Sequence, residues 1–152
     1  MLLGSIILPS EGIERLLKLQ LQTSAGLISL ISAYAPTLIS ASELNDRFYD
    51  DLSAAISKVP PQTPLFIFGD FNAGVGADHS SWPICLGHFG IGNMNENGQC
   101  LLELCCHHSL SITNTFFMTK PQHKVSWRHP KSNTGTSLTW FSHDALTSAM
   151  SN

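Results

Sequence analysis

A short apolar run that ends abruptly in polar residues constrains this chain more than any other feature. Leu65 to Phe68 are apolar throughout and too few for a helix, which is typical of a strand buried on both faces. Gly69 then breaks the run, and Asp70 and Asn72 follow two positions apart. If the backbone stays extended, both side chains project to the same side of the strand end and form a candidate reaction site. Asp and Asn also begin turns by bonding to nearby backbone, so a simple turn is the alternative interpretation.

The composition predicts one globular domain with a hydrophobic core. Hydrophobic residues make up 43% of the 152 residues and charged residues 12%. The formal net charge is -3 and Lys and Arg form no run, which excludes a broad basic surface for nucleic acid. A nucleic acid partner would therefore bind locally, through a cleft, and the oligomeric state stays open.

The cysteines and the apolar start predict an intracellular protein, nuclear or cytoplasmic. The four cysteines, at positions 85, 100, 105 and 106, lack both the paired spacing of a zinc site and the density of a disulfide scaffold, so we expect reduced thiols. Adjacent residues on one helix point about 100° apart, so Cys105 to His108 cannot converge on one metal ion. Met1 to Leu8 carries no basic residue and is cut short by Pro9, which predicts neither a signal peptide nor a membrane span.

Hydrophobic periodicity predicts an α/β fold in which strands alternate with two helices and the sheets are mixed. Alternating leucines over 17–22 and the apolar stretch 27–34 predict an antiparallel hairpin. Ser40 and Glu43 are spaced as a capping box, and the helix that they begin continues to Ile56. An ordered surface loop over 73–95, a second helix over 98–108, a strand over 110–113 and a short strand over 125–127 follow.

Four motifs, in this order, resemble the endonuclease/exonuclease/phosphatase family: ISAYAP at 31–36, GDFNA at 69–73, TNTFF at 113–117 and SWRHP at 126–130. Within the family the chain is similar to the craniofacial development protein 2-like group and to the endonuclease domains of LINE-type retrotransposons. The resemblance covers residues 1–133, which we expect to form a partial domain. It implies a partial four-layered α/β sandwich, in which two mixed, largely antiparallel sheets are flanked by helices. It also implies phosphodiester hydrolysis with a divalent cation, Mg²⁺ or Mn²⁺.

The resemblance implies roles for five residues. Asp70 would act as the general base that positions or deprotonates the attacking water, and Asn72 would orient that carboxylate and donate to a phosphate oxygen. Tyr34 would donate its phenol to the phosphoryl group as charge develops. Asn114 and Trp127 match positions that line the substrate cleft.

Residues that bind the catalytic metal in the family have no counterpart in this pattern. Family members carry a metal-binding Glu before the first motif, and an Asp and an Asp-His pair after the last one, so we expect a domain that lacks both ends. Asp70 and Asn72 alone would hold Mg²⁺ weakly. Two interpretations stay open: a weakly active Mg²⁺-dependent endonuclease, and a catalytically inactive relic that acts at most as a binding or structural fragment.

Residues 134–152 diverge from the family, and we interpret them as a disordered tail produced by a change of reading frame. With one choice of codons for residues 135–144, reading from the last base of Thr134 gives WHQLDLVLTR, which resembles the family strand that carries the missing Asp. We expect the transcript across codons 133–144 to encode this strand in the alternative frame. A transcript that does not encode it there would contradict the hypothesis.

Overall fold

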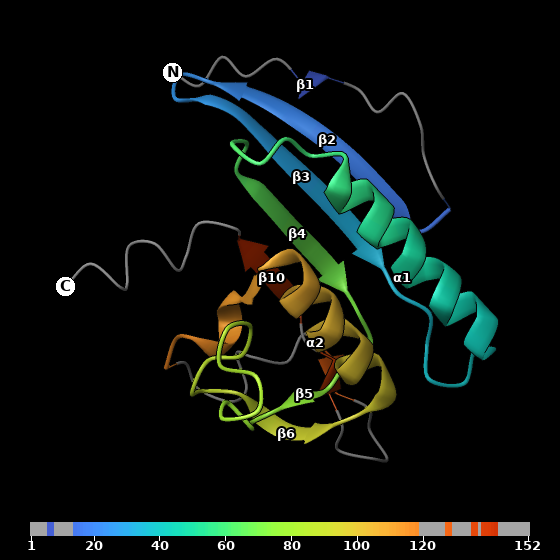
Figure 1. The fold of residues 1–152 in the computed structure, drawn as a ribbon. Helices are drawn as coiled ribbons and strands as arrows, with labels where there is room; N and C mark the ends of the chain where they lie inside the picture. The colour runs from blue at the N-terminus through green and yellow to red at the C-terminus, as the bar shows by residue number, and fades with distance from the viewer. Residues whose placement is uncertain (1–5, 8–13, 119–126, 129–134, 137, 143–152) are drawn as a thin grey trace.

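Strands and helices alternate along the chain, which confirms the α/β class (Figure 1). The computed structural model describes the backbone of residues 6–7, 14–118, 127–128, 135–136 and 138–142, and the side chains of residues 14–118. In chain order, the elements are β1 (Ile6–Ile7), β2 (Leu16–Thr23), β3 (Gly26–Tyr34), α1 (Ser42–Ser57), β4 (Leu65–Asp70), β5 (Val75–Gly76), β6 (Ile91–Met94), α2 (Glu96–His108), β7 (Ser111–Ile112), the 3₁₀ turn η1 (Thr113–Thr115), β8 (Trp127–Arg128), β9 (Gly135–Thr136) and β10 (Leu138–Ser142).

Six strands form one mixed sheet in the order β1-β2-β3-β4-β10-β7. β2 and β3 pair antiparallel, which confirms the predicted hairpin. β3 and β4 pair in parallel, because α1 carries the chain back to the other end of the sheet. β10 pairs antiparallel with both β4 and β7. The other described strands form two separate pairs, β5-β6 and β8-β9, so the second large sheet of the expected sandwich stays a prediction.

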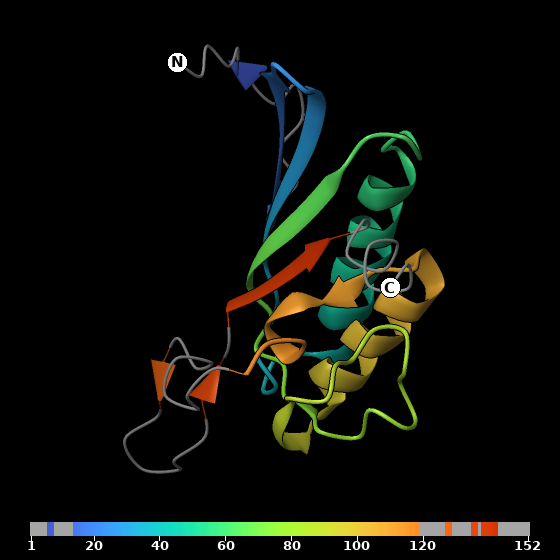
Figure 2. The same ribbon diagram turned by 90° about the vertical axis from the view of Figure 1, so that its left-hand side faces the viewer.

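Both helices lie on the same face of the six-stranded sheet (Figure 2). Leu65 and Ile67 of β4 are 3% and 1% exposed, whereas the alternate residues Phe66 and Phe68 are only half-buried. The prediction that β4 is buried on both faces is therefore wrong in the described part of the chain. No described helix has both the length and the apolar character needed to cross a bilayer.

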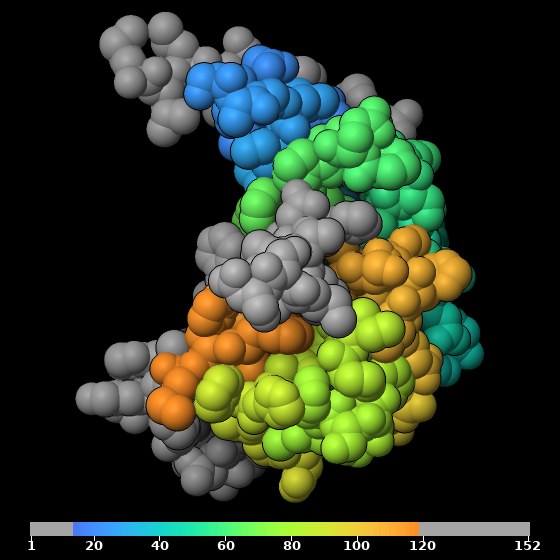
Figure 3. All heavy atoms as spheres, turned by 60° about the vertical axis from the view of Figure 1, so that its left-hand side comes forward, coloured from blue at the N-terminus to red at the C-terminus, as the bar shows by residue number. Residues whose placement is uncertain are grey.

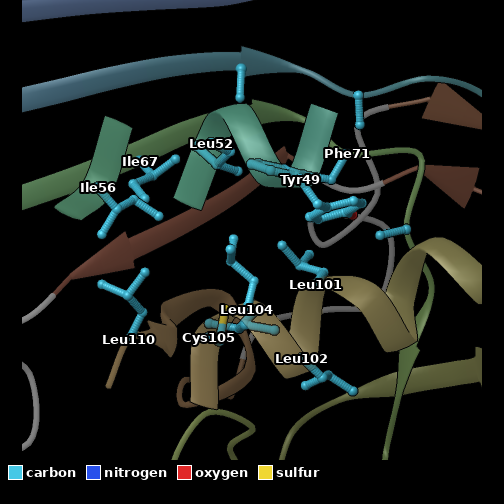
Figure 4. Close-up of a cluster of buried hydrophobic side chains, with 14 of the residues drawn as sticks. Tyr49, Leu52, Ile56, Ile67, Phe71, Leu101, Leu102, Leu104, Cys105 and Leu110 are labelled. Atoms are coloured by element: carbon cyan, nitrogen blue, oxygen red, sulfur yellow. The ribbon is translucent and has the colours of Figure 1, made fainter. Parts of the chain in front are cut away.

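The core forms where α1 and α2 meet beneath the sheet. Leu52 and Tyr49 of α1 face Leu101 and Leu104 of α2, with Ile67 of β4 above them (Figure 4). Leu52 and Leu101 are fully buried, and the other three are at most 9% exposed. Burying a leucine fully contributes about 1.5–3 kcal/mol, so this layer is a principal source of stability.

Both helices begin differently from the prediction. The hydroxyl of Ser40 lies 3.2 Å from that of Thr37, and the N-cap residue Ala41 makes no side-chain bond, so the predicted capping box is wrong. α2 begins at Glu96, two residues earlier than predicted. The reason is Asn95, whose side chain accepts from the backbone N–H of Gly98 at 2.8 Å and caps the helix.

The surface loop predicted over 73–95 contains the strands β5 and β6, and part of the loop between them belongs to the core. Cys85 and Leu86 are completely buried. The carbonyl of Cys85 accepts from Ile112 N at 2.8 Å, and the N–H of Phe89 donates to the carbonyl of Thr115 at 2.8 Å. Figure 3 shows the loop, in yellow-green, against the orange segment that includes η1. The loop therefore supports the turn that carries Asn114.

Residues 138–142 differ from the prediction of a disordered tail, because they form β10 in the middle of the sheet. Leu138 pairs with Asp70 and Phe141 with Ile67. Thr, Trp and Phe favour strands, and without β10 the edge of β4 would be unpaired. The boundary at residue 133 and the origin of the tail stay predictions.

We expect stability to fall as the pH drops from 7 towards 5, through His108. Its Nε2 lies 2.7 Å from the hydroxyl of Ser53, joining α2 to α1. Burial, and then the neighbouring His107, lower the pKa of His108 below its ordinary 6.5. The unfolded chain therefore binds a proton that the folded chain resists, so this contribution is complete above pH 6.5 and is lost as the pH falls through the lowered pKa.

The measurement is the midpoint of thermal unfolding by circular dichroism at pH 5 to 7.5. His108→Gln should flatten the pH dependence, whereas the matched variant Ser53→Ala should lower the midpoint while keeping most of the slope. An unchanged slope in His108→Gln would contradict the assignment.

Candidate functional site

Tyr34 and Asp70 end neighbouring parallel strands and lie opposite each other. The register of β3 and β4 pairs their Cα atoms, and the N–H of Ala35 donates to the carbonyl of Asp70 at 2.9 Å. Side chains alternate along a strand, so both residues belong to the sheet face away from the helices. Tyr34 is 54% exposed and Asp70 is half-buried. The structure thus brings together the two predicted residues at one edge of the sheet.

Gly69 permits the close approach of these two strand ends. Its φ of +151° lies in a region that L side chains rarely adopt, and a Cβ there would overlap the carbonyl oxygen of Ala33. A larger residue would push β4 away from β3. Gly69 therefore fixes how closely Asp70 faces Tyr34.

The backbone leaves the extended conformation directly after Asp70. Asn72 has a φ of +47°, its N–H donates to Oδ1 of Asp70 at 3.0 Å, and its Nδ2 donates to the carbonyl of Ala35 at 3.0 Å. The prediction that Asp70 and Asn72 project to one side of an extended strand is therefore wrong. The turn itself orients the carboxylate of Asp70, because the backbone N–H of Asn72 donates to Oδ1. No described residue donates a hydrogen bond to the other carboxylate oxygen, Oδ2.

Arg15 brings a positive charge to the same edge, and no motif pointed to it. Its guanidinium carbon lies 5.6 Å from the centroid of the Tyr34 ring, and Nη1 donates to the carbonyl of Tyr34 at 3.4 Å. Arg15 directly precedes β2, and the β2-β3 register places it beside Tyr34. Counting along the predicted hairpin would have found it.

Asn97 holds the turn from the helix side. It is 2% exposed, and its Nδ2 lies 2.9 Å from the carbonyl oxygen of Pro36 and 3.4 Å from those of Phe71 and Asn72. The backbone carbonyl of Asn97 accepts a hydrogen bond from the hydroxyl of Tyr49 at 3.0 Å. Burial strongly raises the pKa of that phenol, so Tyr49 stays a donor. One buried amide thus joins α2 to the segments that follow β3 and β4.

Asn95 completes this polar support. Its Oδ1 accepts from the N–H of Gly74 at 3.0 Å as well as from Gly98, and its Nδ2 donates to the carbonyl of Asn72 at 3.4 Å. A Cβ on Gly98 would overlap the carbonyl oxygen of Gly74, so the helix begins in direct contact with this segment. An asparagine directly before a helix is a sequence signal for an N-cap. It was missed because the helix was predicted to begin two residues too late, at Gly98.

Asn114 lies in η1, where its Oδ1 is buried and no described residue donates to it. β7 pairs antiparallel with β10, so η1 follows in the direction of Leu138, the residue that pairs with Asp70. Trp127 begins β8 and pairs with Thr136, and its side chain lies outside the described part of the structure. The roles of Asn114 and Trp127 in substrate binding stay predictions.

The described donors do not complete a magnesium site. Mg²⁺ requires near-octahedral oxygen ligands, usually one or two carboxylates with water and phosphate. Over residues 14–118 no three His, Cys, Asp or Glu side chains come close enough to share an ion. Among the described residues at the strand edge, Asp70 supplies the carboxylate, and Nδ2 of Asn72 already donates to the backbone carbonyl of Ala35. Metal binding by Asp70 and Asn72 stays a prediction.

Known proteins resemble both the sequence and the fold. The sequence is 36% identical over 117 residues, 77% of this chain, to Craniofacial development protein 2 of Bos taurus, and 34% identical over the same length to that of Tragulus javanicus. The chain spans about a fifth of the length of these relatives, 19% and 20%. No family model matches it.

The fold is similar to that of the endonuclease domain of TRAS1, a telomere-specific non-LTR retrotransposon. The TM-score is 0.62 at 16% sequence identity, over 91% of this chain and 53% of that one. The sequence relatives and this structure together confirm the family resemblance and an endonuclease-like fold.

We expect Asn97 to be the most sensitive polar residue near the site. Asn97→Ala leaves buried carbonyl groups without a donor, which should lower the free energy of unfolding by about 1–3 kcal/mol. Asn97→Asp places a carboxylate against the same carbonyl oxygens and should cost more. Urea unfolding measures both, with Gln99→Ala as the control: Gln99 is exposed on the same helix, and its side chain donates to Oε1 of Glu103 at 2.9 Å. A loss of less than about 0.5 kcal/mol in Asn97→Ala would contradict this role.

Proposed function

Because the chain belongs to the endonuclease/exonuclease/phosphatase family, similar to the craniofacial development protein 2-like group and retrotransposon endonuclease domains, we propose that it is a phosphodiesterase-type nuclease domain. Its substrate would be nucleic acid, bound locally at the strand edge. The observation that carries the proposal is the parallel register that places Tyr34 beside Asp70. A phosphate at this edge would meet a carboxylate, a phenol and a guanidinium on adjacent strands.

Asp70 is suited to act on the attacking water. Its Oδ1 accepts from Asn72 N, which fixes the orientation of the carboxylate. The second oxygen, with no described donor bonded to it, is the proposed acceptor for a proton of water. A general base must lie within hydrogen-bond reach of the proton that it removes, and a carboxylate held by a turn meets that demand with little reorganisation.

Tyr34 and Arg15 are suited to the phosphate. Tyr34 is more than half exposed, and its phenol is available to donate on the same sheet face as Asp70. The Arg15 guanidinium lies over the Tyr34 ring, with its carbon 5.6 Å from the ring centroid, and offers donors and a positive charge for a phosphodiester. A local cation also reconciles a nucleic acid substrate with a chain whose formal net charge is -3.

The family implies Mg²⁺ or Mn²⁺, which supplies positive charge to the phosphoryl oxygens in such reactions. The described donors beside Asp70 do not complete a site for it, so we propose weak cleavage. The same observation favours the second candidate, a fragment that binds nucleic acid without cutting it.

A plasmid-nicking assay tests the proposal. With Mg²⁺ or Mn²⁺ we expect slow nicking of supercoiled DNA that EDTA abolishes and that Asp70→Asn lowers by roughly 10²–10⁴-fold, the usual contribution of a general base. The matched control is Asp50→Asn, because Asp50 is an exposed carboxylate on α1, away from the strand edge.

Binding of a labelled oligonucleotide, followed by fluorescence anisotropy, separates the two candidates. Binding that weakens in Arg15→Gln, without any nicking by the unmodified chain, would establish the binding fragment instead of the nuclease. A chain that neither binds nor nicks would contradict both.

A further inference from the structure

Two thiols outside the candidate site lie unusually close together. The Sγ atoms of Cys85, in the loop before β6, and Cys106, near the end of α2, are 2.7 Å apart, and both cysteines are free. Non-bonded heavy atoms usually approach to about 3.5–4.0 Å, and the sulfurs of a disulfide lie about 2.05 Å apart. The two sulfur atoms therefore lie between the usual non-bonded distance and the length of a disulfide bond.

The backbone on both sides of this pair is held in place. The carbonyl of Cys85 accepts from Ile112 N at 2.8 Å, and its thiol lies 3.7 Å from the carbonyl oxygen of Leu102. Leu102 and Cys106 are four residues apart in α2, so they share one face of the helix. Closing the pair requires the two sulfur atoms to move about 0.6 Å closer together.

The two thiols differ in their exposure to solvent. Cys106 is exposed, whereas Cys85 is completely buried. Burial raises the pKa of the Cys85 thiol to about 12, with a further contribution from Cys106. An oxidant in solution therefore reaches Cys106 first, and Cys85 is placed to respond to the product.

We propose that Cys85 and Cys106 form a redox pair that closes a reversible disulfide when a peroxide oxidises Cys106. In the first step the Cys106 sulfur attacks hydrogen peroxide, giving a sulfenic acid and one water. In the second step the Cys85 sulfur attacks the sulfenic sulfur, the S–S bond forms, and the thiol proton leaves with the hydroxyl group as a second water. A dithiol reductant restores both thiols, so a reducing compartment keeps the pair open.

The remaining cysteines are less well placed to compete. Cys105 is completely buried, and its side chain points about 100° away from that of Cys106 around the helix. Cys100 precedes Cys106 by six residues, about 9 Å along the helix axis, and its Sγ lies 3.8 Å from Nδ2 of Asn45.

Closure would fasten the loop onto α2. The same loop supports η1, because the N–H of Gly87 donates to the hydroxyl of Thr115 at 2.7 Å. The disulfide would thus restrain the segment that carries Asn114. It would also restrict the unfolded chain between residues 85 and 106, which predicts a more stable oxidised form.

The test uses the full chain, treated with stoichiometric hydrogen peroxide, blocked with an alkylating reagent, digested and mapped by mass spectrometry. We expect one linked peptide pair, Cys85 with Cys106, that dithiothreitol releases, and a midpoint of thermal unfolding roughly 5–10 °C higher in the oxidised form. Cys106→Ser and Cys85→Ser should each abolish the link and the shift. Cys100→Ser is the matched control and should retain both.

Three outcomes would overturn the proposal. The first is a link between other cysteines, and the second is a disulfide-linked dimer through Cys106. The third is Cys106 oxidised to the sulfinic acid while Cys85 stays a free thiol. If a serine variant does not fold, the peptide map of the unmodified chain still decides between the proposed pair and these outcomes.

Discussion

The parallel pairing of β3 with β4 is the contact on which both the core and the candidate site depend. On one face, alternation points Leu65 and Ile67 towards the helices, where both are buried. On the other face, the same register sets Tyr34 opposite Asp70. A shift of one residue would expose the apolar residues and turn the carboxylate towards the helices, so packing of the core fixes the geometry of the site.

The turn after β4 owes its shape to groups far away in sequence. The carbonyl groups of Pro36, Phe71 and Asn72 surround the amide of Asn97, which is buried at the start of α2. A buried carbonyl without a donor costs about 1–3 kcal/mol, so these carbonyls favour one position of the helix and one path of the turn. The segment that carries Asp70 is therefore held by the same contacts that position α2 on the sheet.

Periodicity and motif order were enough to predict the class of the fold, the β2-β3 hairpin and the positions of Tyr34 and Asp70 at the ends of their strands, but not Arg15 beside them. GDFN forms the turn of the alternative interpretation, and this turn orients the carboxylate of Asp70. The left-handed conformation of Asn72 could not be read locally, since it is accompanied by a bond to Ala35, 37 positions earlier. Loop residues carry no periodicity, so nothing in the sequence marked Cys85 as part of the core.

Burial of β4 was mispredicted for a similar reason. Four apolar residues in a row indicate that both faces of a strand are compatible with burial. The actual exposure of Phe66 and Phe68 depends on which elements cover each face of the sheet. That is a property of the whole assembly of elements, and the strand's own sequence does not contain it.

The pairing of β10 with β4 places fewer demands on the sequence than the chemistry of the site does. The position beside β4 requires a strand, and the sequence LTWFS supplies one that pairs with β4 from Leu138 to Ser142. The residue that it sets opposite Asp70 is Leu138, and residues 134–142 contain no carboxylate. Many sequences can fill a gap in a sheet, because the backbone makes the hydrogen bonds, but a second acidic group beside Asp70 requires one particular residue at one position. A chain of this family can therefore keep a strand beside β4 whether or not that strand carries an acidic residue.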